Sequence, residues 1–236
     1  PVLYGFTDAD LDPAVRCEPL FGPDETKTLR QVLDRLKELY SDSIGVEYQN
    51  IPDNRPRAWL RREIEKHAYA DIDGETDKKH ILERLIQADS FETFLHKKYV
   101  GAKRFGVTGG DSLIPMLAFM LEEAGDHDVD QVIFGMAHRG RLNVLHNIMG
   151  KPEDAMLSEF EKTPEPERYV GSSDVKYHMG YSSDFQTRDG KEIHMSLCFN
   201  PSHLEFVNPV VLGRARAKQQ RRGLAEAQGR ILPVLM

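Results

Sequence analysis

Apolar residues recur every three or four positions over much of the first hundred residues, which is the period of an α-helix with one buried face. The pattern predicts helices over residues 23–40, 57–70 and 76–99. In the first of them, Leu29, Val32 and Leu36 share one face after the start signal Pro23-Asp24. The sequence before this helix is rich in Pro, Asp and Gly and has no sustained period, as expected of an arm or linker.

After Gly101, short apolar runs alternate with amphipathic helices. Residues 132–134 and 231–236 have the composition of strands buried on both faces, and residues 193–199 alternate between two faces of a third strand. One face of that strand carries Ile193, Met195, Leu197 and Phe199. The opposite face carries His194, Ser196 and Cys198.

Helices are predicted between these strands. Ser112 follows a glycine turn and is expected to cap a helix whose apolar stripe includes Leu121, and a second helix is expected around residues 142–149. Ser202 and Glu205 fit a capping box for a third. This alternation predicts an α/β fold with an open, mostly parallel sheet. The expected parts are an arm or linker at 1–23, a helical subdomain at 24–100 and the start of an α/β domain at 101–236.

Composition narrows the class of protein. The chain has 236 residues, 29% of them charged, and a net charge of −7, which argues against disorder and against a general binder of nucleic acid or membrane surfaces. It has no apolar run long enough to cross a bilayer. The cysteines Cys17 and Cys198 cannot form a disulfide framework, so we expect a soluble protein from a reducing compartment. Because the chain starts at Pro1 and stops in an apolar run, we expect a piece of a longer protein.

Candidate chemistry gathers where two of the predicted strands end. Ligands of open α/β sheets bind at the carboxyl ends of the strands, and residues 135–143 (GMAHRGRLN) and 200–205 (NPSHLE) occupy that place. His138 and His203 would then lie at strand-to-helix turns that favour an anion, and Arg139 would add a bidentate donor. We therefore expect a phosphate-containing cofactor or an acidic substrate.

Plainer interpretations stay open for the same residues. Either histidine could simply satisfy a backbone carbonyl, Ser202 could serve only as a helix cap, and Arg139 or Arg141 could pair with an acidic residue. His178 lies in a loop, where function concentrates, so the functional interpretation is favoured for it. No metal site is predicted, and the basic run at 214–222 fits a solvated helix face.

Three motifs in order resemble those of one enzyme family. The runs at residues 135–145 and 200–205, with DVKYHMG at 174–180 between them, are similar to the thiamine-diphosphate-dependent first component of the 2-oxoglutarate dehydrogenase complex. IGVEY at 44–48 and KRFG at 103–106 match the same family in the same order. The resemblance therefore extends over most of the chain.

That resemblance implies a cofactor and a reaction. The family decarboxylates 2-oxoglutarate on thiamine diphosphate and passes the succinyl group to the lipoyl arm of a succinyltransferase component. It implies that Arg139 belongs to the diphosphate-binding region. Ser202 and Leu204 would line the pocket for cofactor and substrate.

The resemblance also implies roles for the histidines. His178, with Ser202, would bind the substrate, while His138 and His203 would stabilise the developing oxyanion or carry protons. In the family, the motif that ligates Mg²⁺ follows a strand that corresponds to residues 231–236. The metal ligands are therefore expected outside this chain, which by itself is expected to be inactive.

A full-length parent would be a homodimer with its active site at the subunit interface. Its compartment would be the bacterial cytoplasm or, alternatively, the mitochondrial matrix. Two other functions stay open, a non-catalytic helical docking module and the 2-oxoadipate paralogue, although Tyr177-His178 favours 2-oxoglutarate. An unrelated nucleotide-binding domain is disfavoured because neither a G-x-G-x-x-G nor a P-loop pattern follows the strands.

Overall fold

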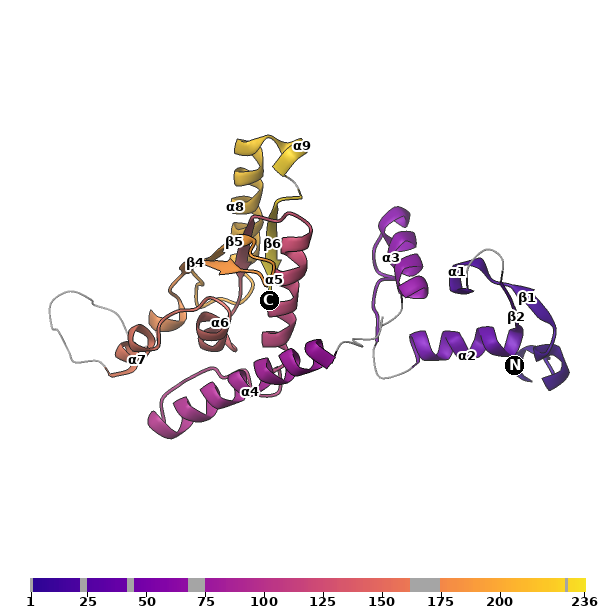
Figure 1. Ribbon diagram of the computed structural model, residues 1–236, viewed down its shortest axis with the longest axis horizontal. Helices are drawn as coiled ribbons and strands as arrows, with labels where there is room; N and C mark the ends of the chain where they lie inside the picture. Colours follow the sequence, from indigo (N-terminus) through magenta and orange to yellow (C-terminus); the bar gives the residue numbers. More distant parts are fainter. Residues whose placement is uncertain (1, 22–24, 42–44, 68–74, 162–174, 228) are drawn as a thin grey trace. The chain divides into compact units, whose positions relative to one another are not determined.

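The chain divides into two units at Gly74, each with its own elements (Figure 1). The first unit is Pro1–Gly74 and the second is Glu75–Met236. The computed structural model describes residues 2–21, 25–41, 45–67, 75–161, 175–227 and 229–236. Within these residues, none of the helices combines the length and the apolar character needed to cross a bilayer.

The first unit contains a small antiparallel hairpin and two longer helices. Its elements are 3₁₀ helices at Val2–Tyr4 and Asp8–Leu11, β1 (Ala14–Arg16), α1 (Glu18–Phe21), β2 (Thr26–Thr28), α2 (Leu29–Tyr40) and α3 (Asn54–His67). A capping box starts α2, because Thr28 Oγ1 accepts from Gln31 N at 3.3 Å and Gln31 Oε1 accepts from Thr28 N at 2.9 Å. Two helices of this region are confirmed, with the first beginning at Leu29. Its expected start signal, Pro23-Asp24, lies outside the described residues.

The second unit is built on a four-stranded sheet. Its helices are α4 (Glu75–Lys98), α5 (Leu113–Asp126), α6 (Arg141–Asn147), α7 (Glu153–Glu161), a 3₁₀ helix (Val175–Tyr177), α8 (Val207–Arg222) and α9 (Leu224–Ala227). Its strands are β3 (Gln131–Gly135), β4 (Tyr181–Gln186), β5 (Glu192–Leu197) and β6 (Ile231–Leu235). The order in the sheet is β4-β5-β3-β6, with β5, β3 and β6 parallel and β4 antiparallel. The predicted open, mostly parallel sheet is confirmed.

Helices cover both faces of the central strand β3 (Figure 1). Val132 and Phe134 are buried in the core formed with α4, α5 and α6, whereas Ile133 is buried against α8. The alternation predicted for β5 holds for its strand residues. Phe199 was expected to continue the face of Ile193, Met195 and Leu197, but β5 ends at Leu197 and Phe199 is 69% exposed.

Strand β6 occupies one edge of the sheet. Pro233 lies opposite Ile133, and Met236 N donates to Gly135 O at 2.9 Å. On the other side of β6, Gln219 of α8 donates from Nε2 to Ile231 O at 2.9 Å. The missing N–H of Pro233 therefore does not interrupt the hydrogen bonds between β6 and β3, which are made by the neighbouring residues of β6.

Two elements occur in a stretch that the sequence predicts as a loop as far as Gly190. These are α7 and β4, while residues 162–174 of that stretch lie outside the described part. Strand β4 exposes Ser182, Asp184 and Gln186, so only half of its residues carry a burial signal, as is usual for an edge strand. Its pairing with β5 depends on residues further along the chain, which local periodicity does not reveal.

Helix α4 belongs to the second unit, although the sequence places it in a helical subdomain that ends at residue 100. Its residues Phe91 and Leu95 are buried in the core of the sheet. The cap predicted for α5 is also absent: Ser112 has helical backbone angles, φ −60° and ψ −15°, and makes no side-chain capping bond. Asp111 instead accepts from Gly109 N at 2.9 Å, so the turn before the helix is held by the aspartate.

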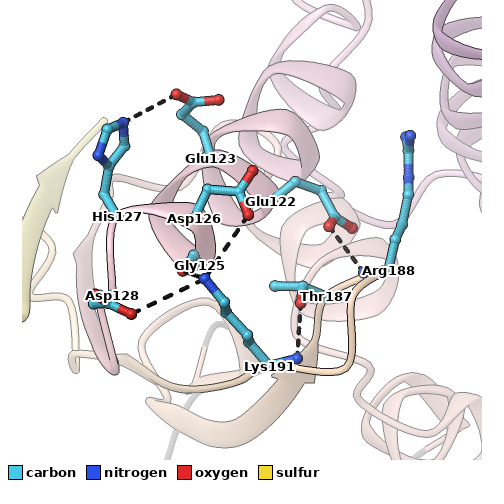
Figure 2. Close-up of polar contacts among 9 residues, drawn as sticks. All are labelled: Glu122, Glu123, Gly125, Asp126, His127, Asp128, Thr187, Arg188 and Lys191. Atoms are coloured by element: carbon cyan, nitrogen blue, oxygen red, sulfur yellow. Dashed lines mark hydrogen bonds and ion pairs between the residues drawn. The ribbon is translucent and has the colours of Figure 1, made fainter.

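The end of α5 is fastened to the turn between β4 and β5, at the edge where the parallel strands begin (Figure 2). Lys191 donates from Nζ to Gly125 O at 2.7 Å, which places a positive charge at the helix C-terminus. Its backbone N donates to Thr187 Oγ1 at 2.9 Å, and Arg188 N donates to Glu122 Oε2 at 3.0 Å. Gly125 allows this close approach, because a Cβ built on it would lie 2.6 Å from Thr187 Cγ2.

Replacing this glycine is expected to destabilise the fold. In Gly125→Ala the new methyl meets a threonine held by its own turn, so the free energy of unfolding should fall by about 1–3 kcal/mol. Gly213→Ala is the matched control, because Gly213 is also helical and has nothing within 4 Å of its Cβ position. It should gain up to about 1 kcal/mol of stability. Urea unfolding followed by circular dichroism compares the two, and equal effects would contradict the tight contact.

Candidate active site

The parallel strands bring the predicted segments to one edge of the sheet. Phe134 pairs with Leu197 and, on its other side, with Val234, so β3, β5 and β6 end together. His138 follows β3 and Asn200 follows β5. The carboxyl edge therefore carries both strand-end turns, which is where ligands of such sheets bind.

Two histidines from different segments meet at this edge. The rings of His138 and His178 lie 5.0 Å apart between centroids and at 85° to one another, an edge-to-face contact. Phe105 packs against His138, with 5.2 Å between ring centroids, and against Tyr177, the residue before His178, at 4.8 Å. Tyr177 is buried, and its hydroxyl donates to Lys103 O. The aromatic contacts thus hold the two imidazoles together.

A short hydrogen bond fixes the tautomer of His178. Its Nδ1 lies 2.6 Å from Asn200 O, and Asn200 N donates back to His178 O at 3.0 Å. Because a carbonyl oxygen only accepts, Nδ1 must carry a proton. When the ring is neutral, Nε2 is then a proton acceptor, and it becomes a donor only in the imidazolium.

A buried arginine bonds to the backbone segments that carry the two histidines. Arg141 is 0% exposed and donates to three backbone carbonyls, Met136 O at 3.1 Å, Met179 O at 2.8 Å and Cys198 O at 2.8 Å. Burial lowers the pKa of Arg141 to about 10, so it stays charged at neutral pH. The ion pair with an acidic residue considered from the sequence is wrong for Arg141, whose partners are carbonyls. Charge-assisted bonds of this kind stabilise by roughly 1.5–3 kcal/mol each.

Arg139 lies at the surface of the same turn. Its Nη2 donates to Thr108 O at 2.9 Å, and its side chain is exposed. The next residue, Gly140, has φ +73° and donates to Phe105 O at 2.6 Å. A Cβ on it would lie 2.9 Å from Val107 Cγ2, so glycine is needed to bring this turn against the 105–108 segment.

The residues after Asn200 form an exposed loop. Ser202 Oγ lies 3.4 Å from His203 Nδ1, whose ring contacts Phe206 at 5.5 Å, and Leu204 is 65% exposed. The expected capping box is wrong, because α8 begins at Val207 and Glu205 has a left-handed backbone with φ +69°. Ser202 is therefore not used as a helix cap, which leaves its hydroxyl at the surface of the edge.

The donors at this edge suit an anionic ligand. Asn200 is 3% exposed, and within the described residues its Nδ2 has no hydrogen-bond partner. A buried donor without an acceptor costs about 1–3 kcal/mol, which an acceptor on a ligand would recover. Together with the Arg139 guanidinium and the Ser202 hydroxyl, it gives this edge several hydrogen-bond donors. Across the described part of the chain, no group of three or more His, Cys, Asp or Glu residues could hold a metal ion.

Comparison with known proteins bears directly on this edge. The chain is 44% identical over 223 residues to the 2-oxoglutarate dehydrogenase E1 component of Cupriavidus necator, a match that covers 94% of the chain. The proteins of the same name from Brucella anthropi and Brucella canis are 48% and 47% identical over 220 residues, or 93% of the chain. The chain is homologous to a segment of these E1 components. No family model matches it.

The match covers only part of each E1 component. The chain spans 23% of the length of the Cupriavidus protein and 22% of the Brucella proteins. This share fits the expectation of a piece of a longer protein. The resemblance inferred from the motifs is confirmed by these relatives, whereas the roles given to individual residues stay predictions.

Some residues at the carboxyl edge of the sheet are not indicated as site residues by the sequence pattern. Phe105, Tyr177 and Asn200 fall inside the matching motifs, but nothing in their spacing indicates the contacts that they make. Arg141 is in the same run as His138 and was considered only for an ion pair. Its neighbours in the sequence include Arg139 and Asn143, so residue types alone do not indicate that its side chain is buried.

The His178 tautomer can be observed directly. At a pH where the ring is neutral, ¹⁵N NMR of the labelled chain should show His178 protonated at Nδ1 and unprotonated at Nε2, because Asn200 O accepts from Nδ1. His127, exposed at the opposite edge and 3.2 Å from Glu123, serves as the reference. A mixture of tautomers at His178 like that of a solvated imidazole would contradict the short hydrogen bond.

Proposed function

We propose that this chain supplies one part of the active site of a 2-oxoglutarate dehydrogenase E1 component. The whole enzyme would decarboxylate 2-oxoglutarate on thiamine diphosphate and transfer the succinyl group to a lipoyl arm. The observation that carries the proposal is the contact between His138 and His178 at the carboxyl edge of the sheet, in a chain 44–48% identical to E1 components. Each imidazole comes from a separate motif, so their meeting supports a shared task.

The donor-rich edge fits thiamine diphosphate. Bound there, the cofactor would supply the carbanion that adds to the ketone and the electron sink for loss of carbon dioxide. Arg139 would contribute to the diphosphate-binding region, and Ser202 and Leu204 would line the pocket from the exposed loop. The buried Asn200 amide offers a further donor to an acceptor on the ligand. Mg²⁺ would be held by ligands outside these 236 residues.

The histidines would act on the substrate. His178 and Ser202 would bind it. Because Asn200 O holds the Nδ1 proton, Nε2 is the nitrogen of His178 that would face the substrate, and it donates to a substrate oxygen only when both ring nitrogens are protonated. His138 would stabilise the oxyanion formed from the ketone, or carry its proton. The edge-to-face contact with His178 would fix the position of the His138 ring for this role. His203, on the exposed loop beside Ser202, would share in proton transfer.

The remaining assignments concern the assembled protein. The partners proposed are a lipoyl-bearing succinyltransferase component and a second E1 chain in a homodimer. The bacterial sources of the similar proteins support the bacterial cytoplasm as the compartment. The thiamine-diphosphate-binding fold is likewise proposed for the second unit, on the basis of its parallel sheet and of these relatives.

Substitution of the paired histidines tests the proposed roles. In an E1 component of full length that carries this sequence, His138→Ala and His178→Ala should each lower kcat/KM for 2-oxoglutarate by about 10²–10⁴-fold, the usual range for lost acid–base or oxyanion groups. His127→Ala is the control, since His127 precedes β3 and so lies at the edge where the parallel strands begin. Circular dichroism verifies that each variant is folded.

The other functions considered from the sequence give different results in the same assay. A docking module would keep full activity in both histidine variants and lose only binding to the succinyltransferase component. An enzyme specific for 2-oxoadipate would turn over that acid in preference to 2-oxoglutarate. Either result would overturn the proposed function.

The chain alone is expected to be inactive. Titration calorimetry with thiamine diphosphate and Mg²⁺ should give no heat beyond dilution, because the metal ligands are proposed to lie outside it, and carbon dioxide release from 2-oxoglutarate should not be detected. Binding at micromolar levels, about −8 kcal/mol, would show instead that Arg139 and the two strand-end turns form a site without those ligands.

A further inference from the structure

One guanidinium joins the three segments that build the candidate site. Arg141 donates to Met136 O after β3, to Met179 O before β4 and to Cys198 O after β5. These acceptors are 5, 38 and 57 residues away along the chain. The side chain therefore adds a common donor to three segments that are otherwise joined pairwise, by the bonds from Cys198 N to Phe134 O and from Asn200 N to His178 O.

Each acceptor lies next to a group of the site. Met179 directly follows His178, and Met136 precedes His138 by two residues. Cys198 precedes Asn200 by two residues, and Asn200 O holds the Nδ1 proton of His178. A shift of any of these carbonyls would move an imidazole or the acceptor that orients it.

The geometry suits arginine and no other side chain. Its planar fork presents five N–H donors in fixed directions, whereas lysine offers one ammonium point. An apolar residue of similar size would avoid burying a charge, but it would leave the buried carbonyls of Met136 and Cys198 and the part-buried carbonyl of Met179 without this donor. The full burial of Arg141 shows that the fork faces only the protein and takes no part in contact with solvent.

We propose that Arg141 is a positioning residue, which sets the relative placement of His138 and His178 by bonding all three segments at once. The claim about placement rests on the contacts of this chain, and its effect on turnover rests on the proposed function. Arg141 itself would not touch substrate or cofactor.

The test compares variants of Arg141 in an E1 component of full length that carries this sequence. Arg141→Lys and Arg141→Ala should lower kcat by roughly 10²-fold, the cost of a misplacement of about 1 Å, with a smaller change in KM. Guanidinium ion at low concentration should restore part of the lost activity of Arg141→Ala, whereas ammonium ion at equal ionic strength should not. Arg216→Met, at an exposed position of α8, is the matched control.

A measurement other than turnover distinguishes a role of Arg141 in positioning His178 from a role in overall stability alone. The ¹⁵N signals of His178 in folded Arg141→Lys should lose the single Nδ1-protonated tautomer, because Cys198 O and Met179 O lose their shared donor and the segments of Asn200 and His178 can shift against one another. A folded variant that retains both kcat and the His178 signals would overturn the proposal. If the unsubstituted enzyme does not decarboxylate 2-oxoglutarate, the proposed function fails, while the His178 signals still decide the role of Arg141.

If neither Arg141→Lys nor Arg141→Ala folds, the hydrogen bonds of Arg141 can be tested in the unsubstituted chain. Three hydrogen-bonded Nη protons predict separate, slowly exchanging NMR signals for Arg141. Averaged signals like those of the exposed Arg216 would overturn the proposal.

Discussion

The second unit depends on its central strand being paired in parallel on both sides. Strand β3 lies between β5 and β6, and its residues alternate between the core under α5 and the core under α8. A strand buried in this way must give all its backbone groups to its neighbours, so its register is fixed. That register brings the ends of β3 and β5 level, and the position of every group at the candidate site follows from it.

The sequence predicts the elements that have a strong period of their own. The longer helices and the three parallel strands are all evident, because one buried face imposes a clear spacing of apolar residues. The antiparallel strand β4 is not evident: Ser182 and Asp184 face outward, and pairing with β5 gives the segment its structure. The capping pattern at Ser202 and Glu205 also misleads, because the local motif predicts a helix from residue 203, whereas α8 starts four residues later, at Val207.

At the candidate site, the sequence identifies positions and the structure supplies their relations. His138 and His178 are 40 residues apart in sequence numbering, and only the folded sheet shows that their rings are in contact. The partners of Arg141 are backbone carbonyls. Every residue has one, so the sequence does not indicate which of them Arg141 bonds to. Residue types therefore indicate which chemistry is present, whereas the bond to Asn200 O shows which nitrogen of His178 carries a proton.

The edge strand β6 has consequences for self-association. The backbone N–H of Met236 donates to β3, so the backbone N–H and C=O groups of Val234 and Leu232 also point toward β3. The backbone groups of Pro233, which lies between them, point away from β3. That outward position has no N–H to offer, and the neighbouring outward carbonyl of Ile231 is already taken by Gln219. An incoming strand would find two of its expected hydrogen bonds missing along a five-residue edge. Within this chain, Pro233 and Gln219 thus reduce the number of backbone groups that β6 offers to another strand.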